Sequence, residues 1–120
     1  MYLATGRIEE VANHVRGALA LSRRLGARAV EARALYPAGE IASTGGAEDP
    51  GVEVAVDYHR QALALAEPRG MRSLVAHCHS GLSKLHLRSG NLELGQEHVT
   101  IATAMYREMS MTYWEMRQLG

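Results

Sequence analysis

Hydrophobic and polar residues follow one another along most of the chain with the period of an α-helix. In residues 7–25, apolar or small side chains recur every three or four positions, and the same spacing returns in residues 52–66 and 71–85. Such a stripe covers one face of a helix, which is then buried against a neighbour. No stretch sustains the period of two that a β-strand requires. The pattern therefore predicts an all-α protein.

Glycines and one long loop divide these stripes into separate helices. Gly26, Gly70 and Gly90 each follow a helical run, where a residue free to adopt positive φ can close the last turn. Residues 44–51 form the one long predicted loop, rich in turn formers. Pro37 lies inside the second predicted helix, where we expect a kink or a break into two short helices. The predicted helices lie near residues 7–25, 27–43, 52–68, 71–89 and 91–109, and a further one starts near residue 111.

The chain also matches itself at two fixed shifts. Residues 18–21 recur as residues 62–65, a shift of 44, and a second shift of 40 carries Ala62 to Ala102. The predicted loop absorbs the difference, because insertions are tolerated best in loops. A helical pair that returns about every forty residues is typical of an α-solenoid, in which each hairpin buries its apolar face against its neighbours.

At these positions the sequence resembles the tetratricopeptide repeat. That family carries L-G-x-x-Y on the first helix of each pair and A-x-x-x-F, then a small residue, on the second. At the positions of the first-helix motif, this chain has Leu82-Ser83 with His86, and Ala38-Gly39 with Ala42. At the positions of the second-helix motif, it has Ala55, His59 and Ala62, and again Gly95, Val99 and Ala102. The period exceeds the usual ~34 residues, no Trp begins a repeat, and most aromatic places are vacant.

The resemblance implies a right-handed α-solenoid of antiparallel hairpins, about two and a half repeats, forming a single domain over residues 1–120. Residues 60–67, 75–79 and 102–109 are also similar to the C-terminal arrays of large bacterial ATPase, adenylate-cyclase-type or transcriptional regulators. Residues 2–6 align with residues 86–90. We therefore expect residues 2–6 to end a preceding helix, and the chain to be a slice of a longer array with apolar faces at its ends.

In tetratricopeptide arrays the first helices line a concave groove that receives a peptide or protein segment. The resemblance implies that nine residues of this chain line the groove: Arg33, Tyr36, Glu40, Ser43, His77, Ser80, Lys84, Leu87 and Arg88. Lys84 and Arg88 form a basic pair one turn apart, which favours acidic or carboxylate-bearing segments. The alternative is an ordinary solvated helix face, since scattered surface Arg and Lys are common.

Composition and charge narrow the class of function. Hydrophobic residues make up 47% of the chain, while thirteen basic residues balance thirteen acidic ones. A neutral chain gives no electrostatic reason to bind nucleic acid or an anionic membrane. No apolar run approaches the ~20 residues of a membrane span, and no signal-peptide core is present. The single cysteine, Cys78, favours a reducing compartment, so we expect a cytoplasmic protein.

The candidate chemistry points away from catalysis. His77 and His79 point about 200° apart on a helix, so they cannot share a metal ion. His79 and His86 lie on one face but ~10 Å apart, which is too far for one metal ion unless side chains from another part of the chain also converge on it. Cys78 falls on an apolar stripe and is predicted to be buried. We predict no metal, no cofactor and no enzymatic activity, although an enzyme using the histidines is a third hypothesis. The favoured function is protein–protein interaction, and the second is a self-assembly element that oligomerises through uncapped repeat ends.

Overall fold

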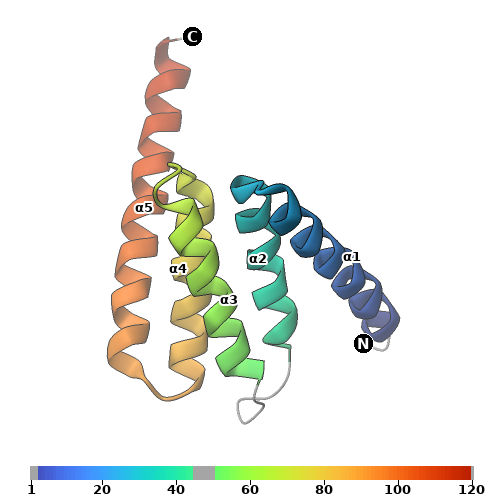
Figure 1. Ribbon diagram of the computed structural model, residues 1–120. Helices are drawn as coiled ribbons and strands as arrows, with labels where there is room; N and C mark the ends of the chain where they lie inside the picture. The colour runs from blue at the N-terminus through green and yellow to red at the C-terminus, as the bar shows by residue number, and fades with distance from the viewer. Residues whose placement is uncertain (1–2, 45–50, 120) are drawn as a thin grey trace.

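The computed structural model describes the backbone of residues 3–44 and 51–119, and the side chains of residues 9–44, 51–112 and 116–118. These residues form helices and no strand, so the prediction of an all-α protein is confirmed. The helices are α1 (Leu3–Leu25), α2 (Arg28–Ala42), α3 (Gly51–Ala66), α4 (Arg72–Arg88) and α5 (Leu92–Leu119) (Figure 1).

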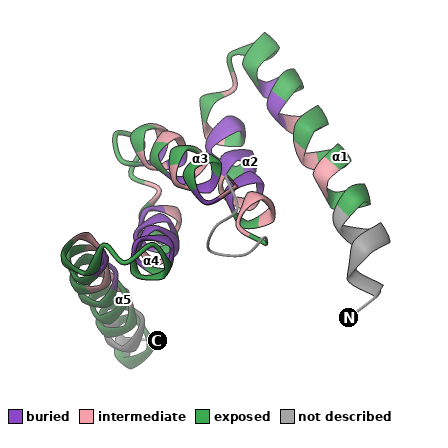
Figure 2. Cartoon of the chain, turned by 90° about the horizontal axis from the view of Figure 1, so that it is seen from below, coloured by how far each residue is buried: buried purple, intermediate pink, exposed green. Residues whose placement is uncertain are grey.

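Each helix packs against the next one along the chain, and α2 also approaches α4. Figure 2 shows α1 and α5 at opposite ends, with α2, α3 and α4 between them. Buried residues gather on the facing sides of these three central helices. The functional candidates on α2 and α4 are therefore carried by the most firmly packed part of the molecule.

Three of the turns between helices are built in the same way. Gly26, Gly70 and Gly90 have φ of 69°, 66° and 84°, as their place after helical runs predicts. In each turn the amide after the glycine donates to a carbonyl five residues earlier, for example from Ala27 N to Ser22 O at 2.9 Å. This Schellman arrangement satisfies the last carbonyls of a helix and requires a residue that tolerates positive φ.

Two predicted helix ends are wrong. Helix α1 begins at Leu3 and runs through Gly6, so residues 3–6 do not end a separate helix, and residue 2 lies outside the described residues. Helix α5 continues to Leu119 instead of breaking near residue 110. Ser110 stands 40 residues after Gly70. Because serine does not favour the positive φ that closes the other turns, the helix continues.

Proline does not divide the second helix. Helix α2 is continuous over Arg28–Ala42 with Pro37 inside it, so the predicted break into two short helices is wrong. Pro37 has no amide to donate to the carbonyl of Arg33, and the alternative of a kink at this place stays a prediction. The predicted loop over residues 44–51 falls largely outside the described residues: Thr44 lies in a turn, and Gly51 begins α3.

The core consists of small and medium-sized side chains. One cluster joins all of the first four helices, and a smaller one joins Val52, Ala55 and Leu85. The first cluster contains Leu19, Ala34, Leu35, Ala38, Ala62 and Cys78. With so many alanines the helix backbones approach closely, as the shortage of aromatic residues predicts. The predicted burial of Cys78 is confirmed, since its side chain is fully enclosed.

Polar contacts tie the end helices to the centre. The largely buried carboxylate of Glu31 accepts from Arg23 of α1 at 3.1 Å and from Arg28 at 3.2 Å, while Arg23 also donates to Gln61 of α3. At the other end, Arg72 of α4 pairs with Glu108 of α5.

Among the described residues, no helix is long and apolar enough to cross a membrane.

Candidate functional site

A cavity of about 390 Å³ lies between α2 and α4. Glu40 of α2 and Ser43, which directly follows that helix, line one side of it, and helix α4 contributes the rest of the lining. The α4 residues are Gly81, Lys84, Leu85, Leu87 and Arg88. Five of the nine predicted groove residues, Glu40, Ser43, Lys84, Leu87 and Arg88, thus line one cavity.

A histidine between two glycines brings the two walls of this cavity together. His59 of α3 is fully buried, with Gly39 of α2 on one side and Gly81 of α4 on the other. A Cβ placed on either glycine would lie 2.8 Å from an atom of the His59 ring. Only residues without a side chain permit this approach, so the close packing of α2 and α4 on α3 requires both glycines.

The surroundings of the His59 ring favour its uncharged form. Neither ring nitrogen has a hydrogen-bond partner among the described residues. Burial lowers the pKa of His59, and this effect outweighs the opposing influence of the Glu40 carboxylate, whose Oε2 lies 4.0 Å from Nε2. The neutral ring is the form that a closed apolar site tolerates.

The walls of the cavity carry opposite charges. On α2, the Tyr36 hydroxyl donates to Glu40 Oε1 at 2.8 Å, which orients the carboxylate, and burial together with Glu40 raises the pKa of Tyr36. On α4, Arg88 Nη1 donates to the carbonyl of Ser43 at 3.0 Å. Lys84 is exposed and has no ion pair or hydrogen bond among the described residues.

The other four predicted groove residues lie elsewhere. Arg33 lines a separate, mostly apolar cavity of about 370 Å³ between α1 and α2. Ser80 is half-buried, and its carbonyl accepts from the Ser83 hydroxyl at 2.8 Å. Tyr36 and His77 do not line the cavity, but their ring centroids lie 6.0 Å apart, so they form a contact between α2 and α4.

A third ring extends this contact to α5. The Tyr106 and His77 centroids lie 5.6 Å apart, and the Tyr106 hydroxyl is 2.7 Å from His77 Nδ1. The sequence analysis did not identify Tyr106, because the shift of 40 aligns it with Ala66, which gives no signal for a ring at that place. We call Tyr36, His77 and Tyr106 the ring row.

Three further histidines meet between α4 and α5. His79 and His86 lie two turns apart on α4, as predicted, and His98 of α5 lies between them. The Nδ1 atoms of His79 and His98 are 2.9 Å apart, and the ring of His98 stacks on His86 with centroids at 5.6 Å. Sequence spacing on α4 alone could not identify the contribution of His98, which depends on how α5 packs.

This cluster favours uncharged rings. Burial is the main cause that lowers the pKa of His79, His86 and His98, and for His98 the two neighbouring histidines lower it further. In the part of the chain that the structure describes, no group of three or more His, Cys, Asp or Glu side chains is placed to hold a metal ion. A neutral His79–His98 pair can share one proton as an ordinary hydrogen bond.

The cysteine is not prepared for nucleophilic chemistry. Burial, together with the nearby charge of Glu67, raises the pKa of the Cys78 thiol to about 12. The thiolate is the reactive form, so a protonated and enclosed thiol acts as a small apolar side chain.

Comparison with known proteins gives no match: no family model fits the chain, and no curated protein or solved structure is significantly similar to it.

Proposed function

We propose that this chain is a non-catalytic interaction module of the tetratricopeptide-repeat type, which binds a peptide or protein segment between α2 and α4. The observation that carries the proposal is the cavity there, with the free ammonium of Lys84 on one wall. A pocket with convergent polar groups on rigid helices is the kind of surface that receives an extended segment.

The repeat assignment rests on three properties of the helices. Helices α1, α3 and α5 contain the segments that match at shifts of 44 and 40. Successive helices pack on one another, and three turns share one capping arrangement. A right-handed stack of about two and a half hairpins has these properties, because each unit contacts only its neighbours.

The proposed ligand carries a carboxylate. Lys84 and Arg88 lie one turn apart on α4, and both line the cavity. The Glu40 carboxylate opposite is already bonded to Tyr36, and the Arg88 guanidinium already donates to Ser43. Lys84 is therefore the side chain that gains most from a carboxylate of the partner.

The test compares capped synthetic peptides that carry Asp or Glu with peptides in which the same residues are Asn or Gln. Binding is measured by fluorescence anisotropy with the wild-type chain, with Lys84→Glu and with Arg107→Glu. The control makes the same charge change at an exposed residue on α5. We expect acid-dependent binding that weakens about tenfold in Lys84→Glu and stays within about twofold in the control. Equal effects of the two substitutions, or no dependence on the acidic residues, would contradict the proposal.

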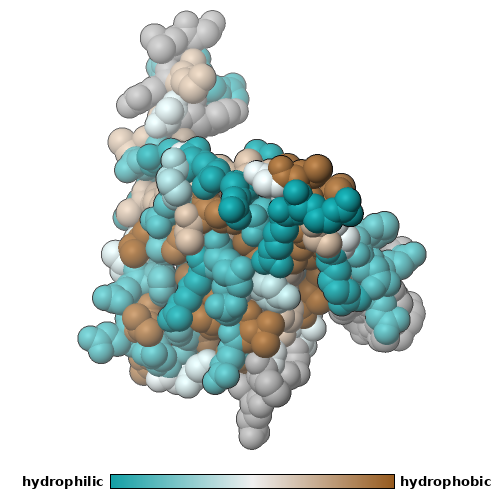
Figure 3. Space-filling view, in the orientation of Figure 1, coloured by the Kyte–Doolittle hydropathy of each residue, from teal (hydrophilic) through white to brown (hydrophobic). Residues whose placement is uncertain are grey.

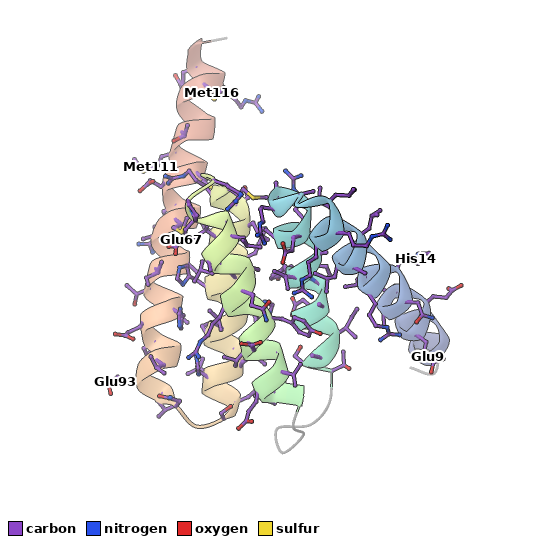
Figure 4. The ribbon with its side chains drawn as sticks, in the orientation of Figure 1. Glu9, His14, Glu67, Glu93, Met111 and Met116 are labelled. Atoms are coloured by element: carbon purple, nitrogen blue, oxygen red, sulfur yellow. The ribbon has the colours of Figure 1, made fainter. Side chains whose placement is uncertain are left out.

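A second candidate function is self-assembly through the ends of the array. Leu92, Met111 and Met116 on α5 are between 63% and 67% exposed, and Leu25 at the end of α1 is 71% exposed. Figure 4 shows Met111 and Met116 on the part of α5 that extends beyond the other helices. Large apolar side chains at the end of a helical stack favour contact with another copy.

The cellular setting is proposed from the sequence alone. The resemblance to regulator arrays supports a role within a bacterial signalling or transcription regulator. A single, buried cysteine is compatible with the reducing cytoplasm, where we place the protein.

A further inference from the structure

The ring row joins three helices beside the proposed peptide cavity. Tyr36, His77 and Tyr106 come from α2, α4 and α5, and the centroids of successive rings lie 6.0 Å and 5.6 Å apart. His77 is exposed, Tyr106 is 39% exposed and Tyr36 is half-buried. A solvent-accessible surface of aromatic rings therefore continues the face of α4 that carries Lys84.

The polar atoms of these tyrosines are already in use. The Tyr36 hydroxyl donates to Glu40, and the Tyr106 hydroxyl shares a hydrogen bond with His77 Nδ1. What the ring row offers a ligand is consequently ring faces and edges, which prefer another ring in a tilted or offset arrangement.

We propose that the ring row binds an aromatic side chain of the same peptide whose acidic residue pairs with Lys84. This inference rests on the proposed function, and it adds a second determinant of specificity. A cationic side chain is less suited to the place, because Lys84 and Arg88 lie on the same helix and repel positive charge.

The spacing of the two determinants follows from helix geometry. His77 and Lys84 are seven residues apart on α4, which places them on one face about 10 Å apart. A peptide in the polyproline II conformation has three residues per turn and rises about 3.1 Å per residue, so side chains three residues apart lie on one side of it and roughly 9 Å apart. The recognised segment is therefore Glu-x-x-aromatic or its reverse.

The test uses capped, fluorescein-labelled peptides containing Glu-Gly-Ser-Tyr, Glu-Gly-Ser-Leu or Glu-Gly-Ser-Arg, each also in reverse order. They are titrated with the wild type, Lys84→Glu, Tyr106→Leu, Tyr106→Phe and Ile101→Ala. Ile101 is a matched control because it is 41% exposed on α5 and lies about 140° around the helix from Tyr106. Circular dichroism of each variant verifies the fold.

We expect the tyrosine peptide of one orientation to bind about three- to tenfold more tightly than its leucine counterpart, the range typical of an aromatic pair. Tyr106→Leu removes this advantage, whereas Tyr106→Phe and Ile101→Ala keep it. Loss of the advantage in Tyr106→Phe would assign it to the hydroxyl and overturn the proposal.

Three other results also overturn it, and the first two separate it from the proposed function. If binding depends on Glu and Lys84 but the tyrosine and leucine peptides bind equally, the ring row has no role. The proposed function of the cavity then stands without it. If the arginine peptide binds more tightly than the tyrosine peptide, the ring row binds a cation and not an aromatic side chain. If no peptide depends on Lys84, both proposals fail.

Discussion

The ring of His59 fills the space between Gly39 and Gly81, and this contact sets how closely α2 and α4 approach α3. A buried histidine with two unpartnered nitrogens costs stability compared with an apolar side chain of similar size. The position of His59 between Ala55 and Ala62 nonetheless fits the repeat pattern of the sequence analysis, in which a larger residue stands between small ones on the second helix. The packing around it gives a direct prediction at the scale of single residues.

Gly81→Ala should lower the free energy of unfolding by about 1–3 kcal/mol, because the new methyl group would overlap the enclosed His59 ring. Alanine alone would raise helix stability by up to ~1 kcal/mol. Gly17→Ala is the matched control, since nothing lies within 4 Å of its added Cβ, and it should stabilise the chain. Urea unfolding measures both variants.

The same account predicts rescue when the ring is removed. In a His59→Ala background the space beside Gly81 is open, so adding Gly81→Ala should be neutral or stabilising. If Gly81→Ala is as destabilising without the His59 ring as with it, the contact is not the cause.

At the scale of elements, three histidines with lowered pKa values meet at the contact between α4 and α5. His79 and His98 share a short hydrogen bond, and His98 stacks on His86. Glu67 favours the charged form of His79 and Glu97 that of His98, while Arg60 opposes it at His86 and His98. Burial is the largest influence on the pKa of each of these three histidines. Close packing of α4 and α5 therefore disfavours protonation of the rings, and protonation disfavours the packing.

This competition predicts a pH dependence of stability. Groups whose pKa is lowered by folding contribute stability that is complete above their ordinary pKa of about 6.5 and is lost as the pH falls through that value towards the folded one. The free energy of unfolding should therefore decrease from pH 7.5 to pH 5, with His59 contributing in the same direction.

Urea unfolding at several pH values tests this, with His98→Gln expected to reduce the dependence. His14→Gln is the control, because His14 is exposed on α1, away from the cluster. A pH dependence that His98→Gln leaves unchanged would show that the cluster does not cause it.

The elements themselves follow from the sequence where local signals determine them. Gly26, Gly70 and Gly90 end helices because positive φ is needed at those places. The continuation through Gly6 and past Ser110 was not predicted, because a repeat register indicates where a turn is expected but not whether the local residues form one. The same limit applies to the site. Lys84 and Glu40 were placed by register, whereas Tyr106 and His98 depend on how α5 packs against α4.

At the scale of the whole molecule, hydrophobic and hydrophilic residues are mixed over the face shown in Figure 3. The most exposed large apolar side chains are on the outer helices, with Leu92 and Met111 on α5 and Leu25 on α1. If these ends pair, the chain oligomerises, and the cavity between α2 and α4 is left open because neither end helix lines it.

Light scattering after size exclusion tests this pairing. We predict a mass above that of one chain at high concentration, and a lower mass for a double variant Met111→Lys, Met116→Lys. Val54→Lys is the control, because Val54 is an exposed apolar residue on the central helix α3, and it should leave the mass unchanged. A strictly monomeric wild type would exclude self-assembly as the function.

The proposed contact between Lys84 and a carboxylate of a peptide partner is tested most directly by exchanging the two charges. The tightest acidic peptide and a version with lysine in place of its acidic residue are titrated by calorimetry into the wild type and into Lys84→Glu. We predict that each single exchange weakens binding about tenfold and that the double exchange restores much of the loss. If the lysine peptide gains nothing from Lys84→Glu, the carboxylate does not bind at Lys84 and the proposed binding mode is wrong.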